Sequence, residues 1–222
     1  MTRMRGKKSG AQVDVCAQNE PSEWQKRRMT RRLRLAIQQL SAAAMSRFED
    51  EPTRAKWFCM AVFGGRELTL EQNLKDAGVD VFVPRERWTA VKKGVKVEGE
   101  SALLPGYMLV RVLPSAEAFF GLKLQEGVVD FVGGSTGYYE VRLADVTKLK
   151  AICDTNDVSR MAVDRSIGQG SKVQITHGPF AGHDCVVVQV TAARNARATV
   201  WIEAFGDRLK PVTLPLAFLK KV

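Results

Sequence analysis

Two runs of alternating β-branched residues, separated by a glycine-rich connection, constrain the fold of this chain most strongly. The stretch GSKVQITHGPFAGHDCVVVQV at residues 170–190 places Val173 and Ile175 before Gly178 and a run of valines after Gly182. Such alternation predicts two strands with one buried face each, and the glycines provide turn positions that tolerate positive φ. The stretch therefore predicts a strand, a tight turn and a second strand.

The rest of residues 167–222 carries only strand signals. The predicted strands are residues 172–176, 185–190, 198–203 and 211–214. Short strands joined by tight turns in so few residues are typical of a small barrel. We therefore predict a C-terminal β-barrel domain over residues 167–222.

Residues 55–154 have a different pattern, in which short strands and helices alternate. Strands are predicted at residues 56–62, 79–84, 107–112 and 128–134, and helices at 67–77, 115–124 and 143–152. Residues 85–103 are charged, and Lys92-Lys93-Gly94 is the expected tip of a hairpin. The pattern predicts an α+β domain of the sandwich type, followed by a linker at residues 155–166.

The N-terminal residues 1–54 read as a basic extension. Residues 1–21 are polar without periodicity, which favours disorder. Ser22 with Gln25 forms a capping-box pattern, and apolar residues then recur every three or four positions as far as Phe48. We expect a helix near residues 22–48 with arginines on its opposite side, which are either a solvated face or a contact for nucleic acid or a partner.

The distribution of charge along the chain indicates which kinds of partner it binds. The net charge of +10 is concentrated at the two ends, because residues 1–53 hold 11 basic and 6 acidic side chains whereas residues 54–154 hold 14 and 13. A basic excess favours nucleic acid, and a neutral middle block favours a protein-binding role. Four scattered cysteines and no apolar run of membrane-spanning length predict a cytoplasmic protein with no membrane contact.

The sequence contains no constellation typical of an enzyme. His177 and His183 are the two histidines, and His183 with Cys185 supplies too few ligands for a metal site. The GQGSK segment at 168–172 lacks phosphate-loop spacing and precedes a strand. We therefore expect a binding protein with no catalytic residues, metal or cofactor.

Five stretches in order resemble the NusG family of transcription factors. Gly170 to Val188 resembles the KOW motif, and residues 200–222 resemble the end of the same barrel. Upstream, KWFCMAV, LLPGYMLV (103–110) and GVVDFVGG (127–134) resemble elements of the family's N-terminal NGN domain. The resemblance covers residues 55–222 and implies an NGN domain followed by a KOW barrel.

The resemblance implies a non-enzymatic elongation factor that binds RNA polymerase and changes pausing or termination. In the family, an apolar depression on the NGN domain takes the clamp helices of the polymerase. The residues that match its wall are Trp57, Leu104, Pro105 and Tyr107. A short helical region with Phe119 and Phe120 is implied to touch the opposite pincer of the polymerase. From the pattern alone, Trp57 and Tyr107 are equally well explained as strand core residues.

The resemblance also implies two further surfaces. Basic side chains in loops are candidates for contacts with non-template DNA or nascent RNA, with solvated surface charge as the alternative; they are Arg66, Lys92, Lys93 and Lys96. In the KOW barrel, Phe180, Phe205 and Gly206 are the candidate contacts for a small-subunit ribosomal protein or the Rho terminator.

Three departures from the family pattern indicate a specialised paralogue. Leu104 stands where an aromatic residue usually precedes Pro-Gly-Tyr, and the stretch after FVGG lacks the proline-rich turn of the housekeeping members. Ala118-Phe119-Phe120 stands where specialised members have polar residues. The alternative from another functional class is a ribosome-associated or RNA-binding KOW protein without a polymerase role. An RNA-reading sheet carries exposed aromatic residues among basic ones, which the neutral middle block does not favour.

Overall fold

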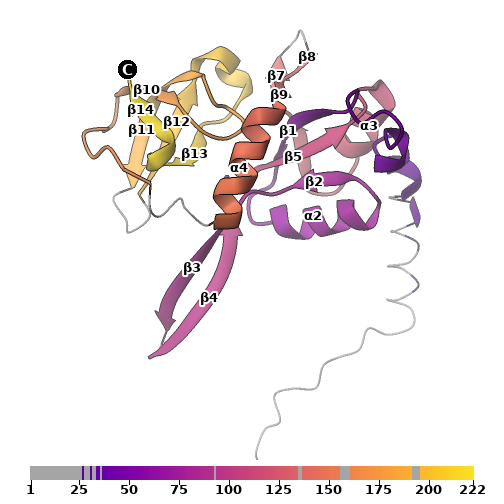
Figure 1. Ribbon diagram of the computed structural model, residues 1–222, viewed down its shortest axis with the longest axis horizontal. Coiled ribbons are helices and arrows are strands. Elements are labelled where there is room, and N and C mark those ends of the chain that lie inside the picture. Colours follow the sequence, from indigo (N-terminus) through magenta and orange to yellow (C-terminus); the bar gives the residue numbers. More distant parts are fainter. Residues whose placement is uncertain are drawn as a thin grey trace, which may run out of the picture.

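The computed structural model contains two sheet-based units joined through a long helix (Figure 1). It describes residues 27, 31, 34–35, 37–92, 94–134, 137–155, 161–191 and 196–222, with side chains left out at 90–92, 134 and 207–208. The N-terminal unit is residues 40–155, and the C-terminal unit is residues 167–222. The expected disorder of residues 1–21 lies outside the described residues.

The N-terminal unit is built on a five-stranded antiparallel sheet. Its strands follow the order β2 (Asp80–Phe82), β5 (Tyr107–Val112), β1 (Lys56–Val62) and β6 (Val128–Phe131), and β9 (Glu140–Val141) also pairs with β1. The central strands are covered on both faces. This double burial explains why KWFCMAV is continuously apolar and does not alternate.

One face of this sheet is closed by helices. Helices α2 (Glu67–Asp76) and α3 (Ala116–Lys123) lay Leu70, Leu74 and Leu122 onto it, and together with the inward residues of β1 and β5 they form one buried cluster. Ser115 caps α3 by accepting a hydrogen bond from the Ala118 amide at 3.1 Å. The expected helices at 67–77 and 115–124 are thus confirmed.

Residues 40–54, called here the strap, complete the same cluster. Leu40, Ala43 and Phe48 are buried in it, and the Met45 amide donates to the Gly78 carbonyl at 2.8 Å. The expected helix through Phe48 is wrong in its extent, because helical backbone ends at Leu40 and is followed by a turn and the short η1 (Met45–Arg47). The turn lets Ala44 bridge to Val79, a contact that a continued helix would prevent.

The opposite face of the sheet carries Trp57, Cys59, Leu104, Tyr107 and Leu109, called here the covered face. Helix α4 (Leu143–Thr155) packs Val146 and Leu149 against it. The same buried cluster continues into the C-terminal unit, so one apolar core joins the two sheets.

The C-terminal unit is a five-stranded antiparallel sheet in the order β13-β12-β11-β10-β14. The strands are β10 (Lys172–Ile175), β11 (Asp184–Thr191), β12 (Arg197–Ile202), β13 (Val212–Pro215) and β14 (Leu219–Lys221), with the short helices η3 (Glu203–Arg208) and η4 (Leu216–Phe218). Gly178 and Gly182 adopt φ of 93° and 89° in the opening turn, and Phe180 between them is fully buried. The predicted hairpin and the predicted α+β fold class are confirmed.

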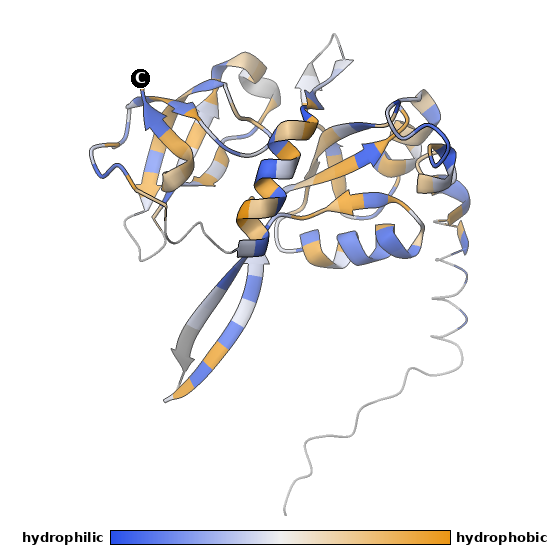
Figure 2. Ribbon diagram, viewed as in Figure 1, coloured by the Kyte–Doolittle hydropathy of each residue, from blue (hydrophilic) through white to orange (hydrophobic). Residues whose placement is uncertain are grey.

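Two hairpins leave the N-terminal unit. The longer, β3 (Arg85–Lys92) with β4 (Val95–Ala102), projects away from both units, and β4 alternates in hydropathy along its length (Figures 1 and 2). Gly94 at its tip has a φ of 79°, as a tight hairpin turn requires. The shorter hairpin pairs β7 (Gly133–Gly134) with β8 (Gly137–Tyr138).

Candidate functional site

The loop before β5 is a rigid turn that presents Tyr107. The Tyr107 amide donates to the Leu104 carbonyl at 3.1 Å, and Gly106 has a φ of 82°, which is a type II turn with proline and glycine in their preferred positions. The buried carboxylate of Glu67 accepts a hydrogen bond from the Gly106 amide at 2.7 Å. The sequence LPGY therefore forms a fixed platform at the edge of the covered face.

The C-terminal unit covers this platform. Tyr107 and Phe180 meet edge to face with ring centroids 5.7 Å apart, and the Tyr107 hydroxyl donates to the Lys210 carbonyl at 3.4 Å. Tyr107 is only 7% exposed, and this burial raises the pKa of its phenol. Leu104 is also buried, whereas Pro105 faces solvent. Three of the four predicted clamp-contact residues are thus core residues in this arrangement.

Arg197 of β12 provides the polar link between the units. Its guanidinium donates to the Leu103 carbonyl at 3.0 Å and forms an ion pair with Glu86 at the base of the long hairpin. Both charged side chains are largely buried, at 19% and 14% exposure. Removal of either partner from such a shielded, hydrogen-bonded pair would leave the other charge buried and unpaired, which is strongly destabilising.

A cluster of three rings closes the other side of the interface. Tyr139 of the N-terminal unit packs against His183 and Phe205, each at a centroid distance of 5.3 Å, and His183 and Phe205 are 5.2 Å apart. Burial lowers the pKa of His183, and nearby Arg142 lowers it further. Of the predicted partner contacts, Phe205 is half-buried here, Phe180 is fully buried, and Gly206 follows with a φ of 55°.

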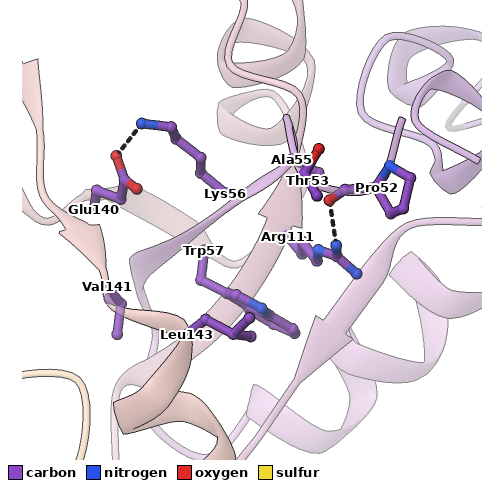
Figure 3. A pocket seen from close by; sticks show the side chains of 9 residues that line it. All are labelled: Pro52, Thr53, Ala55, Lys56, Trp57, Arg111, Glu140, Val141 and Leu143. Atoms are coloured by element: carbon purple, nitrogen blue, oxygen red, sulfur yellow. Dashed lines mark hydrogen bonds and ion pairs between the residues drawn. The ribbon is translucent and has the colours of Figure 1, made fainter. Parts of the chain in front are cut away.

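Trp57 lies beside a pocket of about 270 Å³ that is lined by residues of the N-terminal unit (Figure 3). The Lys150 ammonium of α4 lies 4.7 Å from the centroid of the indole ring. The indole Nε1 is buried and has no hydrogen-bond partner among the described residues. The other lining residues are Pro52, Thr53, Ala55, Lys56, Arg111, Glu140, Val141 and Leu143.

The two predicted α3 phenylalanines have different environments. Phe119 is half-buried, with ring centroids 4.9 Å from Phe58 and 4.6 Å from Tyr138. Phe120 is 65% exposed and is therefore available to a partner. The helical period explains the difference, since consecutive residues lie on different sides of a helix.

The predicted nucleic-acid contacts do not form one cluster in the described part of the chain. Arg66 precedes α2 and pairs with Glu126 at 3.2 Å, and Lys96 on β4 pairs with Glu98 at 2.6 Å. The side chain of Lys92 and the whole of Lys93 lie outside the described residues.

Sequence reasoning missed the residues that join the units. Arg197, Glu86 and Tyr139 carry no local signal, because each acts through a contact with a residue distant in sequence. Trp88 was also missed, although it covers Gly99 across the hairpin so closely that a Cβ there would lie 2.5 Å from the ring. The bare glycine opposite an aromatic residue at a paired position is a usable signal.

Two findings concern other kinds of site. Within the described ranges, His, Cys, Asp and Glu side chains form no group of three or more that would hold a metal ion. None of the helices in the described part of the chain has the length and apolarity needed to cross a membrane.

Comparison with known proteins finds that this chain is similar to one family. The model of the family described as "Transcription termination factor nusG" matches residues 55–150. The NusG protein of Chlamydia trachomatis, named a transcription termination/antitermination protein, is 29% identical over 161 residues, which cover 68% of this chain and 86% of that protein. Its namesake in Staphylococcus carnosus is 24% identical over 182 residues, covering 78% and 99%.

A solved structure of Thermotoga maritima NusG, described as showing domain interaction, aligns with 77% of this chain and 99% of that chain at 19% identity and a TM-score of 0.40. The family match begins one residue before β1 and ends within α4, so it spans the sheet and both helices that cover its first face. Residues 55–150 of this chain therefore match the NusG family model, and the similarity to NusG proteins extends over 68% and 78% of the chain in these two comparisons.

Proposed function

We propose that this protein binds the clamp helices of RNA polymerase through the covered face and thereby modulates elongation and termination. The observation that carries the proposal is the concentration of large, rigid apolar groups on one supported platform. Leu104 and Tyr107 sit on a turn held by Glu67, and Trp57 lines a pocket on the same face. Aromatic side chains on a preorganised support are typical of binding hot spots.

This binding requires the C-terminal unit to leave the covered face. Tyr107 cannot meet a partner while its ring contacts Phe180 and its hydroxyl bonds Lys210. The linker of residues 155–166 permits the movement, because twelve extended residues span about 40 Å. Polymerase binding and the contact between the units therefore compete for one surface.

The exposed Phe120 supports a second contact on the polymerase. It lies on α3, which covers the opposite face of the sheet from Tyr107. A protein held at both places bridges two parts of the polymerase and favours the closed, elongating state. The shift is limited by the differential affinity for the two states, and a few-fold to 100-fold bias corresponds to about 1–3 kcal/mol.

The projecting hairpin supports contacts with the non-template strand or nascent RNA. Lys92 pairs with Val95 and Lys96 pairs with Val91, so both lie at the end of the hairpin that projects from the sheet, whereas Lys93 lies outside the described residues. Lys96 must then exchange its bond to Glu98 for a phosphate, and Arg66 must exchange Glu126. Such exposed pairs contribute little, so this exchange costs little.

Release of the C-terminal unit also frees its own aromatic surface. On separation, Phe205 loses its contact with Tyr139 and becomes accessible, next to Gly206. The part of the Phe180 ring that meets Tyr107 also becomes accessible. We propose that a small-subunit ribosomal protein or Rho binds there. Recruitment would then follow polymerase binding, because one opening event exposes both surfaces.

The test is a pull-down with core RNA polymerase, followed by single-round transcription on a template with a pause. The double variant Trp57→Ala/Tyr107→Ala should lose binding by at least tenfold per site, since hot-spot aromatic residues contribute about 2–4 kcal/mol each. Val95→Ala, at an exposed position on the hairpin, is the matched control. Full binding by a folded double variant would overturn the proposal.

A further inference from the structure

The strap holds one end of a helix rigidly against the N-terminal unit. Residues 31, 34, 35 and 37–40 are helical, as is residue 27, and Leu40 at the end is 1% exposed. The Gln39 carbonyl approaches α3 so closely that a Cβ on Gly121 would lie 2.2 Å from it. The end of this helix at Gln39 and Leu40 is therefore fixed beside α3 (Figure 1).

This helix presents arginines away from the unit that anchors it. Arg27, Arg31 and Arg34 are spaced at i, i+4 and i+7, which places them on one helical face over a rise of about 10 Å. Arg31 and Leu40 are nine residues apart, which corresponds to a rotation of about 180°. Because Leu40 faces the core, the arginines face solvent, and all three are exposed.

These arginines differ from the basic residues of the sheet unit. Lys56 pairs with Glu140, Lys75 with Glu71 and Lys123 with Asp130, all within 2.8 Å. Within the described part of the chain, Arg27, Arg31 and Arg34 have no carboxylate partner. Among the described residues their charge is therefore uncompensated, which leaves it available to an external anion.

The charge of the surrounding sequence points to a polyanion. Residues 26–34 contain six basic and no acidic side chains, and residues 1–37 contain ten basic and three acidic ones. Duplex DNA carries one phosphate charge per about 1.7 Å of axis, which is the densest regular array of anions that such a row can meet. The described residues of this helix, from 27 to 40, include no aromatic side chain to stack on unpaired bases, which favours a duplex over a single strand.

We propose that the face formed by Arg27, Arg31 and Arg34 binds the phosphate backbone of double-stranded DNA without reading its sequence. The strap fixes the end of this helix at Gln39 and Leu40 beside α3, whereas the long hairpin projects elsewhere from the unit (Figure 1). The protein therefore has a duplex contact separate from the hairpin. The contact needs no polymerase and stands independently of the proposed function.

The test is fluorescence anisotropy of the full chain with a labelled 30-base-pair duplex, and with single-stranded DNA and RNA of equal length. The triple variant Arg27→Gln/Arg31→Gln/Arg34→Gln should bind the duplex more weakly and lower the salt slope by about 2.7, at 0.9 per lost phosphate contact. The affinity advantage of the unaltered chain should therefore shrink by about 40-fold between 50 and 200 mM salt.

Two matched controls isolate the helix. The triple lysine variant at the same positions keeps the charge and should keep the salt slope. The variant Lys172→Gln/Lys220→Gln/Lys221→Gln removes three exposed charges from the C-terminal unit and should leave the slope unchanged. An unchanged slope in the folded glutamine variant, an equal loss in the C-terminal control, or tighter binding to either single strand than to the duplex would overturn the proposal.

Discussion

The two faces of the N-terminal sheet are both buried, but by covers of different kinds. One face is covered by α2, α3 and the strap, which belong to the same unit and pack Leu40, Leu74 and Leu122 into one apolar cluster. The covered face is closed by α4 and by the C-terminal unit, which reaches it through Tyr107, Arg197 and Tyr139. The first cover is part of the fold. The second combines aromatic and charge-assisted contacts with an apolar cluster shared by two units that a linker joins, and we propose that it can separate while both units stay folded.

The strongest test of this difference is the substitution Leu40→Ala. Leu40 is buried in the permanent core, and truncation of such a leucine costs about 2–5 kcal/mol. Urea unfolding should show the N-terminal unit destabilised by this amount. Ile37→Ala, three residues earlier at 44% exposure, is the control and should stay within about 0.5 kcal/mol. Equal effects at the two positions would show that the strap is not part of the core.

Arg197→Ala should separate the units without unfolding either one. It removes charge-assisted hydrogen bonds to Leu103 and Glu86, each worth about 1.5–3 kcal/mol, so the separated fraction should rise at least tenfold. Small-angle X-ray scattering would report the separation as a larger radius of gyration, and polymerase affinity should increase in parallel.

The control for this separation is Arg66→Ala, which breaks the exposed pair with Glu126 outside the interface. Exposed pairs contribute about 0–1 kcal/mol, so the scattering profile should not change. If Arg197→Ala leaves both the profile and the polymerase affinity unaltered, the second cover is as permanent as the first.

Acidification should weaken the second cover by a smaller amount. The pKa of His183 is lowered by burial and then by Arg142, with Asp184 opposing, so the joined state binds the proton less readily than the separated state. Joining is therefore fully stabilised above the ordinary pKa of 6.5 and loses stability as the pH falls from there towards the depressed pKa. Scattering between pH 7.5 and 5.5 would measure the change.

His177 contributes to the same pH dependence. Its pKa is also lowered, mainly by burial and then by Lys148 of α4, with Asp145 opposing. The variant His183→Gln should remove part of the dependence and the double variant His177→Gln/His183→Gln should remove the histidine part entirely. If the double variant showed the same pH profile as the unaltered chain, neither histidine would be the source of the pH dependence.

Phe120→Ala should have the smallest effect on stability, within about 0.5 kcal/mol, because the ring is 65% exposed. It should nevertheless reduce the effect of the protein on pause lifetimes in single-round transcription. Phe119→Ala, the neighbouring control, should destabilise the fold by more, since its ring contacts Phe58 and Tyr138. Unchanged pause lifetimes with Phe120→Ala would remove the second polymerase contact from the proposal.

Much of the fold could be predicted because its signals are local. Gly94 and Gly178 mark turns with positive φ, and the strands β1, β2, β5, β6 and β10 to β13 lie close to the predicted ranges. The end of the first helix could not be predicted, because Leu40 and Phe48 are both buried but are joined by a turn that depends on Val79. Periodicity records which residues are buried, and it does not record whether the chain bends between them.

The candidate site shows the same limit. The resemblance to the NusG family selected Trp57, Leu104 and Tyr107 as candidates, and the strand, the proline-glycine turn and the second strand that hold them are specified by neighbours in the chain. That Phe180 covers Tyr107 and that Arg197 meets Glu86 depends on side chains 73 and 111 residues apart. Such contacts leave no periodic trace, since each requires the packing of two complete units. The sequence by itself therefore determined the elements and the chemistry of the face, and only the tertiary structure decided that this face is covered.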